Sequence, residues 1–178
     1  MSVRSILSRR DGAAAAEFVL LLPVLILLLF GSLEAGHFIW TQHKLVEAVR
    51  NGARFASRVE INDVCNGPVQ KDTATIEANI RRVTRTGQLA NADARPLVRG
   101  WTDDQVSVDF DCAAFVASGI YEDNTYRDPA TGKDVVAAGP LVTVTASRVR
   151  YPLLFGRLII ADPDVRMRAT AHAAVIGV

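Results

Sequence analysis

The sequence of 178 residues has few of the residues that build metal and catalytic sites. It contains two cysteines and three histidines, and its formal net charge is only +1. A charge so close to zero gives no overall field that would attract nucleic acid, so a nucleic-acid partner is not expected. Two isolated cysteines also do not make a structural zinc site, which takes four ligands, usually as closely spaced pairs.

The polar residues that are present do not match known catalytic or metal-binding patterns. Two clusters of residues with carboxylate or amide oxygens lack the spacing of a calcium-binding EF-hand, and we interpret them as solvated charge. The first cluster is Asp103, Asp104, Asp109 and Asp111, and the second is Glu122, Asp123, Asn124 and Asp128. Glu34, His37 and His43 form a weak candidate for a metal or proton-relay site, and we favour polar residues at an interface. Gly132-Lys133 lacks the preceding glycine of a phosphate loop, and no serine lies in a nucleophile elbow. The sequence therefore predicts no enzyme, no metal and no cofactor.

One long apolar run is the strongest signal in the sequence. Ala13 to Leu33 spans 21 residues, and Glu17 is the only charged residue among them. A helix of that length covers roughly 30 Å of hydrocarbon at about 1.5 Å per residue. We therefore predict a membrane-spanning helix, in which Pro23 is tolerated with a mild kink. A carboxylate is costly in lipid, which makes Glu17 a candidate functional residue.

The charges that flank the apolar run predict its orientation. Arg4, Arg9 and Arg10 precede the run and are offset only by Asp11. Because positively charged flanks stay in the cytoplasm, we expect a single-pass inner-membrane protein whose C-terminal domain is periplasmic. Trp40, after the run, fits an outer interfacial anchor.

The two cysteines, Cys65 and Cys112, both follow the apolar run. The periplasm is oxidising, so it permits a disulfide between them. Closing a loop of that size would contribute about 4 kcal/mol in the chain-entropy model. We favour this disulfide, and two free buried thiols are the alternative.

Hydrophobic periodicity continues beyond the apolar run. Apolar residues recur at three- and four-residue steps as far as Val59, which predicts one helix from about Ala13 to Arg58. Arg50, Arg54 and Arg58 line another face of this helix. We interpret this arginine stripe as a solvated face in preference to a partner site.

A second helix is expected after a loop over residues 61–71. Asp72 is placed to cap this helix, and Gly87 is placed to end it. The predicted buried face comprises Ile76, Ile80 and Val83.

The remaining elements are predicted strands. Residues 106–110 alternate apolar and polar side chains, and residues 128–133 have the composition of a hairpin or loop turn. Residues 141–149 and 165–175 alternate over longer stretches, so we expect two antiparallel neighbours joined by residues 151–164. A three- or four-stranded antiparallel sheet would cover the outer half of the long helix. The predicted fold class is α+β and pilin-like, with the long N-terminal helix packed against this small sheet.

Several segments share the pattern of one bacterial protein family. The N-terminal ones are Gly12-Ala-Ala-Ala-Ala-Glu-Phe18, the leucine-rich run with Pro23, Glu34-Ala-Gly36 and Ala48-Val-Arg-Asn-Gly-Ala-Arg-Phe-Ala56. The C-terminal ones are Val142–Thr145, Tyr151–Phe155 and Met167–Ala171. The pattern is dense over residues 9–58 and looser over 141–176. Together these segments resemble the TadE/TadG-like proteins of tight-adherence (Tad, or Flp) pilus systems.

The resemblance implies a minor pilin or pseudopilin. A prepilin peptidase would cut after Gly12, so that Ala13 begins the mature chain and Glu17 is its fifth residue. Glu17, with Phe18, would then serve assembly, because its carboxylate pairs with the new α-amino group of an adjacent subunit. The four alanines before Glu17 let neighbouring helices approach closely, although Ala16 stands where such proteins often carry a larger residue.

The implied partners are the prepilin peptidase, other minor pilins, the major pilin, the inner-membrane assembly platform and membrane lipid. We expect a cytoplasmic leader at 1–12, a transmembrane and spine helix at 13–58 and an extracytoplasmic α+β domain at 59–178. After assembly the protein would lie in an extracellular pilus, and tip, shaft and assembly-only roles stay open. The alternative function is an uncleaved, membrane-anchored periplasmic binding domain. An ordinary signal peptide is disfavoured, because no clear Ala-x-Ala exit follows Phe30.

Overall fold

A computed structural model describes residues 11–66, 69–91, 93–112, 125–127, 131–136, 140–155 and 164–176. The chain divides into two compact units. Unit 1 comprises Met1–Trp40 and Leu153–Pro163, and unit 2 comprises Thr41–Pro152 and Asp164–Val178. The leader arginines Arg4, Arg9 and Arg10 lie outside the described residues, as do Glu122, Asp123, Asn124 and Asp128.

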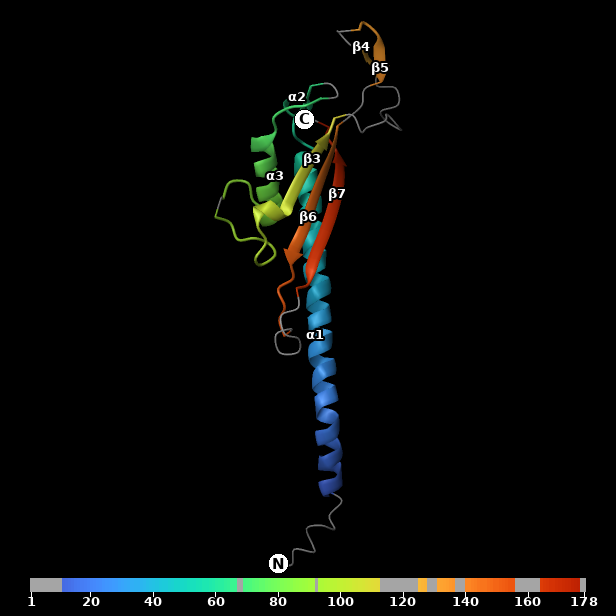
Figure 1. The fold of residues 1–178 in the computed structure, drawn as a ribbon, viewed down its shortest axis with the longest axis vertical. Helices are drawn as coiled ribbons and strands as arrows, with labels where there is room; N and C mark the ends of the chain where they lie inside the picture. The colour runs from blue at the N-terminus through green and yellow to red at the C-terminus, as the bar shows by residue number, and fades with distance from the viewer. Residues whose placement is uncertain are drawn as a thin grey trace, which may run out of the picture. The chain divides into compact units, whose positions relative to one another are not determined.

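The long helix, α1, covers Asp11–Ala56 and continues through Pro23 (Figure 1). The predicted single helix is therefore confirmed, with ends within the usual uncertainty of helix boundaries. Its C-terminal end tightens into a turn, in which Arg58 N donates to Phe55 O and Val59 N donates to Ala56 O, both at 3.2 Å. Such three-residue spacings are common where a helix stops.

A three-stranded antiparallel sheet forms the centre of unit 2 (Figure 1). Its strands are β3 at Val106–Asp111, β6 at Leu141–Arg150 and β7 at Arg166–Ala174, in the order β3-β6-β7. The prediction that the last two strands are antiparallel neighbours is confirmed, with Val144 opposite Ala171. The register shifts between Ala146 and Val149, where Arg148 has a φ of 56°. This is a β-bulge, because Ser147 and Arg148 of β6 together oppose one residue of β7, Arg168.

The sheet packs its apolar face against the part of α1 that lies in unit 2 (Figure 1). Burial alternates along β3 and along the first part of β6, as the sequence predicted. The buried side chains on α1 include Leu45, Val49 and Ala53. One polar contact adds to this packing, since Gln42 Nε2 donates a hydrogen bond to Arg168 O at 3.1 Å. The core of unit 2 thus lies between α1 and the sheet.

The second helix, α3, covers Ala74–Thr86, and its cap differs from the prediction. Thr73, not Asp72, is the N-cap residue. Asp72 lies one position earlier, and its Oδ1 still accepts a hydrogen bond from Ala74 N at 3.2 Å. Gly87 ends the helix as predicted, with a φ of 73° that favours glycine. On the inward face Ile80 and Thr84 are buried, whereas Ile76 and Val83 are only half-buried.

The prediction of a loop over residues 61–71 was wrong in part. It contains a short helix, α2 at Ile61–Val64, and two paired strands, β1 at Cys65–Asn66 and β2 at Val69–Gln70. Elements of two to four residues are too short to carry a periodic pattern.

The turn predicted at residues 128–133, in a hairpin or a loop, connects two paired strands, and residues 128–130 lie outside the described part of the chain. The strand β4, Thr125–Arg127, pairs antiparallel with β5, Asp134–Val136. A 3₁₀ turn, η2 at Asp103–Gln105, leads into β3.

Candidate functional site

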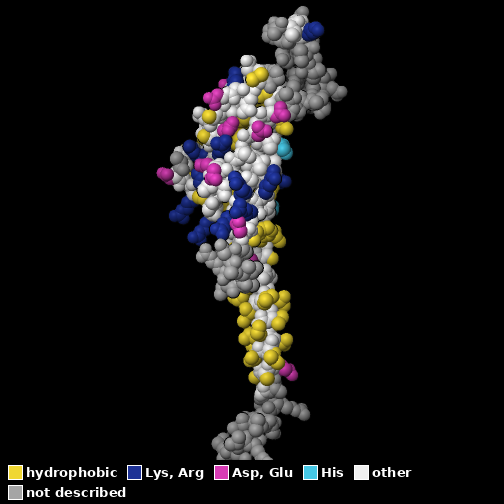
Figure 2. Space-filling model, in the orientation of Figure 1, with side chains coloured by type: hydrophobic (Ala, Val, Ile, Leu, Met, Phe, Trp, Pro, Cys, Tyr) yellow, Lys and Arg dark blue, Asp and Glu magenta, His cyan; other side chains and the backbone are white. Residues whose placement is uncertain are grey.

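The first half of α1 is an apolar helix without cover from the rest of the described chain. Large apolar side chains from Phe18 to Leu29 are exposed, with Leu20 at 78% and Leu22 the least exposed at 38%. Figure 2 shows these hydrophobic side chains around the helix. The helix is long and apolar enough to cross a membrane, judged by its length and composition. A surface of this kind is stable only when lipid or another apolar surface covers it.

Gly12 lies in the first turn of α1, and the protein itself does not require a glycine there. A Cβ at this position would meet no atom within 4 Å. The backbone φ of Gly12 is not positive, unlike that of Gly87. Glycine weakens a helix relative to alanine, and the described contacts of the chain give no packing reason for it at this position.

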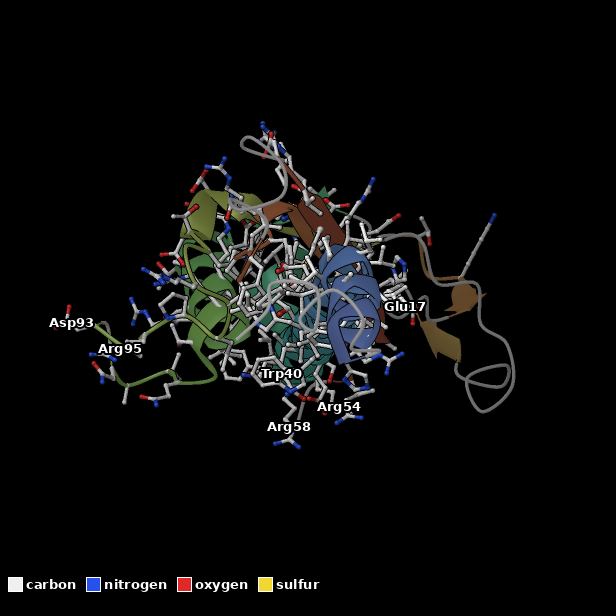
Figure 3. The ribbon with its side chains drawn as sticks, turned by 90° about the horizontal axis from the view of Figure 1, so that it is seen from below. Glu17, Trp40, Arg54, Arg58, Asp93 and Arg95 are labelled. Carbon is white, nitrogen blue, oxygen red and sulfur yellow. A yellow bond between two sulfur atoms is a disulfide. The ribbon has the colours of Figure 1, made fainter. Side chains whose placement is uncertain are left out.

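Glu17 is exposed and points away from the axis of α1 (Figure 3). Among the described residues no hydrogen bond or ion pair involves it. The neighbouring Phe18 ring is 57% exposed. The structure thus places both predicted assembly residues on the open surface of unit 1.

Glu34 makes a contact within unit 1 that the sequence did not predict. Its carboxylate accepts hydrogen bonds from Leu154 N at 3.2 Å and from Phe155 N at 2.8 Å. The Phe155 ring packs against Phe30, with ring centroids 4.8 Å apart. Glu34, a weak candidate metal ligand in the sequence, instead accepts hydrogen bonds from backbone N–H groups. Among the described residues no group of three or more ligand side chains is placed to hold a metal.

An apolar groove runs along α1 next to this contact. It has a volume of about 640 Å³. Its lining residues are Val19, Leu22, Pro23, Ile26, Leu27, Phe30 and Phe155. Every described residue that lines it is apolar, so among them there is no side chain that would orient a polar ligand.

The two cysteines are joined in unit 2. Cys65 and Cys112 form a disulfide with Cα atoms 5.8 Å apart, which links β1 to the residue that follows β3. Within the acidic cluster around β3, Asp103 accepts a hydrogen bond from Arg85 Nε at 2.6 Å.

The arginine stripe on α1 is exposed at Arg50, Arg54 and Arg58. Figure 3 shows Arg54 and Arg58 extending away from the ribbon. A solvated face and a partner site are both exposed, so the interpretation of a solvated face stays a prediction.

A small charge cluster lies where β6 ends and β7 begins. Arg166 donates from Nε to Asp164 Oδ2 at 2.8 Å, and Arg150 Nε lies 3.8 Å from Asp164 Oδ1. The hydrogen bond from Arg166 is the main reason why the pKa of Asp164 lies below its ordinary value. The same pairing raises the pKa of Arg166.

The described residues define a class of protein: one N-terminal helix apolar enough to span a membrane, continued by an α+β unit with a disulfide. Residues 12–54 match the family model of TadE-like proteins. The resemblance to the TadE/TadG-like family is confirmed over this segment, which contains Gly12, Glu17 and Glu34, and it associates the chain with Tad pilus systems. No curated protein and no solved structure matches the chain.

Proposed function

We propose that this protein is a minor pilin or pseudopilin of a Tad-type pilus machine. It is cut after Gly12 and assembles through its N-terminal helix. The observation that carries this proposal is the exposed apolar half of α1, which has one carboxylate, Glu17, without a partner among the described residues. Such a helix suits two successive environments, first the bilayer and then a bundle of neighbouring subunits.

The role of Glu17 follows from its distance to the proposed cut. The new α-amino group of Ala13 would lie one helical turn, about 6 Å along the axis, before Glu17. In a filament, axially shifted helices bring the amine of one subunit beside the carboxylate of the next. Leaving either charge buried and unpaired costs about 3–5 kcal/mol, so the pair favours one axial register. The small, exposed side chains of Ala14 to Ala16 allow that close approach.

The proposed location is the inner membrane, with the N-terminus in the cytoplasm and unit 2 in the periplasm. The leader arginines support this orientation. The disulfide between Cys65 and Cys112 supports an oxidising compartment for unit 2. The proposed partners are a prepilin peptidase, an assembly platform, membrane lipid, and other minor pilins and the major pilin, which unit 2 would contact.

The intact mass of the protein tests the proposal when it is purified from cells with and without the prepilin peptidase. We expect a mature chain that starts at Ala13 only where the peptidase is present. A matched variant, Gly12→Arg, should keep the Met1 start in both strains, because the peptidase site is removed. A Met1 start of the unaltered chain in both strains would favour the uncleaved binding domain. A start beyond Phe30 would indicate an ordinary signal peptide.

A further inference from the structure

The segment Leu153–Phe155 is non-helical backbone held against the outer end of the apolar run. Phe155 stacks on Phe30 at 4.8 Å, and Glu34, one turn further along α1, accepts the N–H groups of residues 154 and 155. The segment and this part of α1 belong to the same compact unit. The depth of Phe30 along the helix therefore determines the depth of the segment.

We propose that Leu154 and Phe155 form a second membrane contact, which enters the outer edge of the lipid bilayer beside α1. Lipid acyl chains would fill the apolar groove that Phe155 and Phe30 help to line. The inference rests on the membrane-spanning part of the proposed function and is independent of cleavage and filament assembly.

The backbone N–H groups of the segment have acceptors on α1. Non-helical backbone is tolerated at membrane depth only where its N–H and C=O groups have partners. The Glu34 carboxylate supplies acceptors for the two consecutive N–H groups at 154 and 155, at 3.2 and 2.8 Å. In return, these donors stabilise a charge that would be costly near hydrocarbon. The carboxylate thus satisfies the two N–H groups, and the N–H groups stabilise the carboxylate. Both can therefore lie at the edge of the bilayer.

Exposed apolar surface surrounds the segment. Leu154 is 54% exposed, and Leu33 and Ile39 on the nearby turns of α1 are 50% and 67% exposed. Among the described residues, only apolar side chains line the groove next to them. Because this groove lies on the helix that is apolar enough to span a membrane, acyl chains are the apolar surface that it would meet before any filament forms. Lipid is therefore the occupant that we propose.

Trp40 lies on the same part of α1 as the segment's contacts. It is six residues after Glu34 and 55% exposed, and tryptophan is enriched at the level of lipid headgroups. The edge of the bilayer is therefore expected close to the turns of α1 that hold the segment.

The test measures the depth of a fluorophore in vesicles of phosphatidylethanolamine and phosphatidylglycerol. The full chain, with its disulfide intact, carries an environment-sensitive label at one introduced cysteine, Leu154→Cys. Spin-labelled lipids that quench near the headgroups or near the bilayer centre report the depth. Two control labels lie at positions of similar exposure. Ile26→Cys is within the apolar run, where Ile26 is 44% exposed, and Leu97→Cys is in unit 2, where Leu97 is 43% exposed.

We expect the label at 154 to be quenched several-fold more by the shallow than by the deep spin label. The label at 26 should show the reverse, and the label at 97 should be quenched by neither. A label at 154 that behaves like the one at 97 would overturn the membrane contact and leave the spanning helix intact. A label at 26 without deep quenching would overturn the spanning helix itself, which separates the two failures.

The role of Glu34 is tested in the same assay. Glu34→Ala in the Leu154→Cys chain should abolish the shallow quenching at 154 and leave the depth at 26 unchanged. Glu34→Gln, which keeps one acceptor oxygen, should retain part of it. Unchanged quenching in Glu34→Ala would show that the carboxylate does not hold the segment in the membrane. Circular dichroism of each variant verifies that the fold is retained.

Discussion

Gly52 of α1 and Thr84 of α3 meet at a contact that leaves no room for a side chain at position 52. A Cβ at Gly52 would lie 1.9 Å from Thr84 Oγ1. That hydroxyl is itself held, because it donates to Ile80 O at 2.7 Å and is fully buried. The glycine therefore sets how closely the two helices pack.

Gly52→Ala should destabilise unit 2, although alanine is the better helix former. Overpacking of this kind costs about 1–3 kcal/mol, which exceeds the gain in helix propensity of about 1 kcal/mol. Urea unfolding of the full chain in detergent measures the change. The control is Asn51→Ala, an exposed position on the same turn, which should be near neutral. Equal midpoints for the two variants would contradict the close contact.

Removal of the disulfide should destabilise unit 2 more strongly. Cys65 and Cys112 are separated by 47 positions in the sequence, and a loop of that size contributes about 4 kcal/mol in the chain-entropy model. The double variant Cys65→Ser/Cys112→Ser should unfold at lower urea concentration than the oxidised protein. Added reductant should lower the midpoint of the unaltered protein and have no effect on the double variant. A midpoint of the unaltered protein that reductant does not move would argue against the bond.

The Asp164 carboxyl should titrate below the ordinary range for aspartate. The hydrogen bond from Arg166 lowers its folded pKa. Its contribution to stability is therefore present above the pKa of the unfolded chain and is lost as pH falls through the lowered folded value. The pair is exposed, so its effect on overall stability is small and decreases with salt. An NMR titration of the carboxyl resonance checks the direction.

The matched variants for this titration are Arg166→Gln and Arg168→Gln on the same exposed face of β7. Arg166→Gln should return the Asp164 pKa towards its ordinary value. Arg168→Gln should leave it nearly unchanged, because no hydrogen bond joins that side chain to Asp164 in the described structure. Equal titrations in both variants would show that the specific bond is not the cause.

Glu17→Ala should leave export intact and block pilus assembly. In the proposed filament, loss of the carboxylate would leave the amine of Ala13 in a neighbouring subunit buried and unpaired, at a cost of about 3–5 kcal/mol per contact. Membrane fractionation measures export, and electron microscopy of cells that carry only this variant measures assembly. Glu47→Ala, an exposed glutamate in the part of α1 that belongs to unit 2, is the control and should assemble normally. The presence of pili on cells that carry only Glu17→Ala would contradict the proposed pairing.

Local patterns predicted much of the fold. The apolar run and its continuation to Val59 predicted one helix, and alternation predicted β3, β6 and β7. These signals are strong because each covers several turns or several strand residues. The N-cap at Thr73 was missed, because Asp72 beside it is an equally good capping residue.

The contacts between distant residues could not be predicted. Glu34 and Leu154 are 120 positions apart, and nothing in either local sequence indicates a partner. Gly52 indicates a close contact, since glycine inside a helix is unfavourable without a packing reason, but it does not indicate that the contact is with Thr84. The compact units also divide inside α1, between Trp40 and Thr41, where the helical pattern has no break.

The bulge in β6 lets the strand hold one residue more than its partner and still keep its buried face. Val142, Val144 and Ala146 are buried before it, and Val149 is buried after it, so the inward-facing positions change from even to odd numbers. Because Ser147 and Arg148 together oppose one residue of β7, deleting either of them would leave regular pairing with Val149 still opposite Met167. The strand should therefore tolerate the loss of one residue at this point, whereas the same deletion between Leu141 and Ala146 would turn the side chains on one side of it to the opposite face.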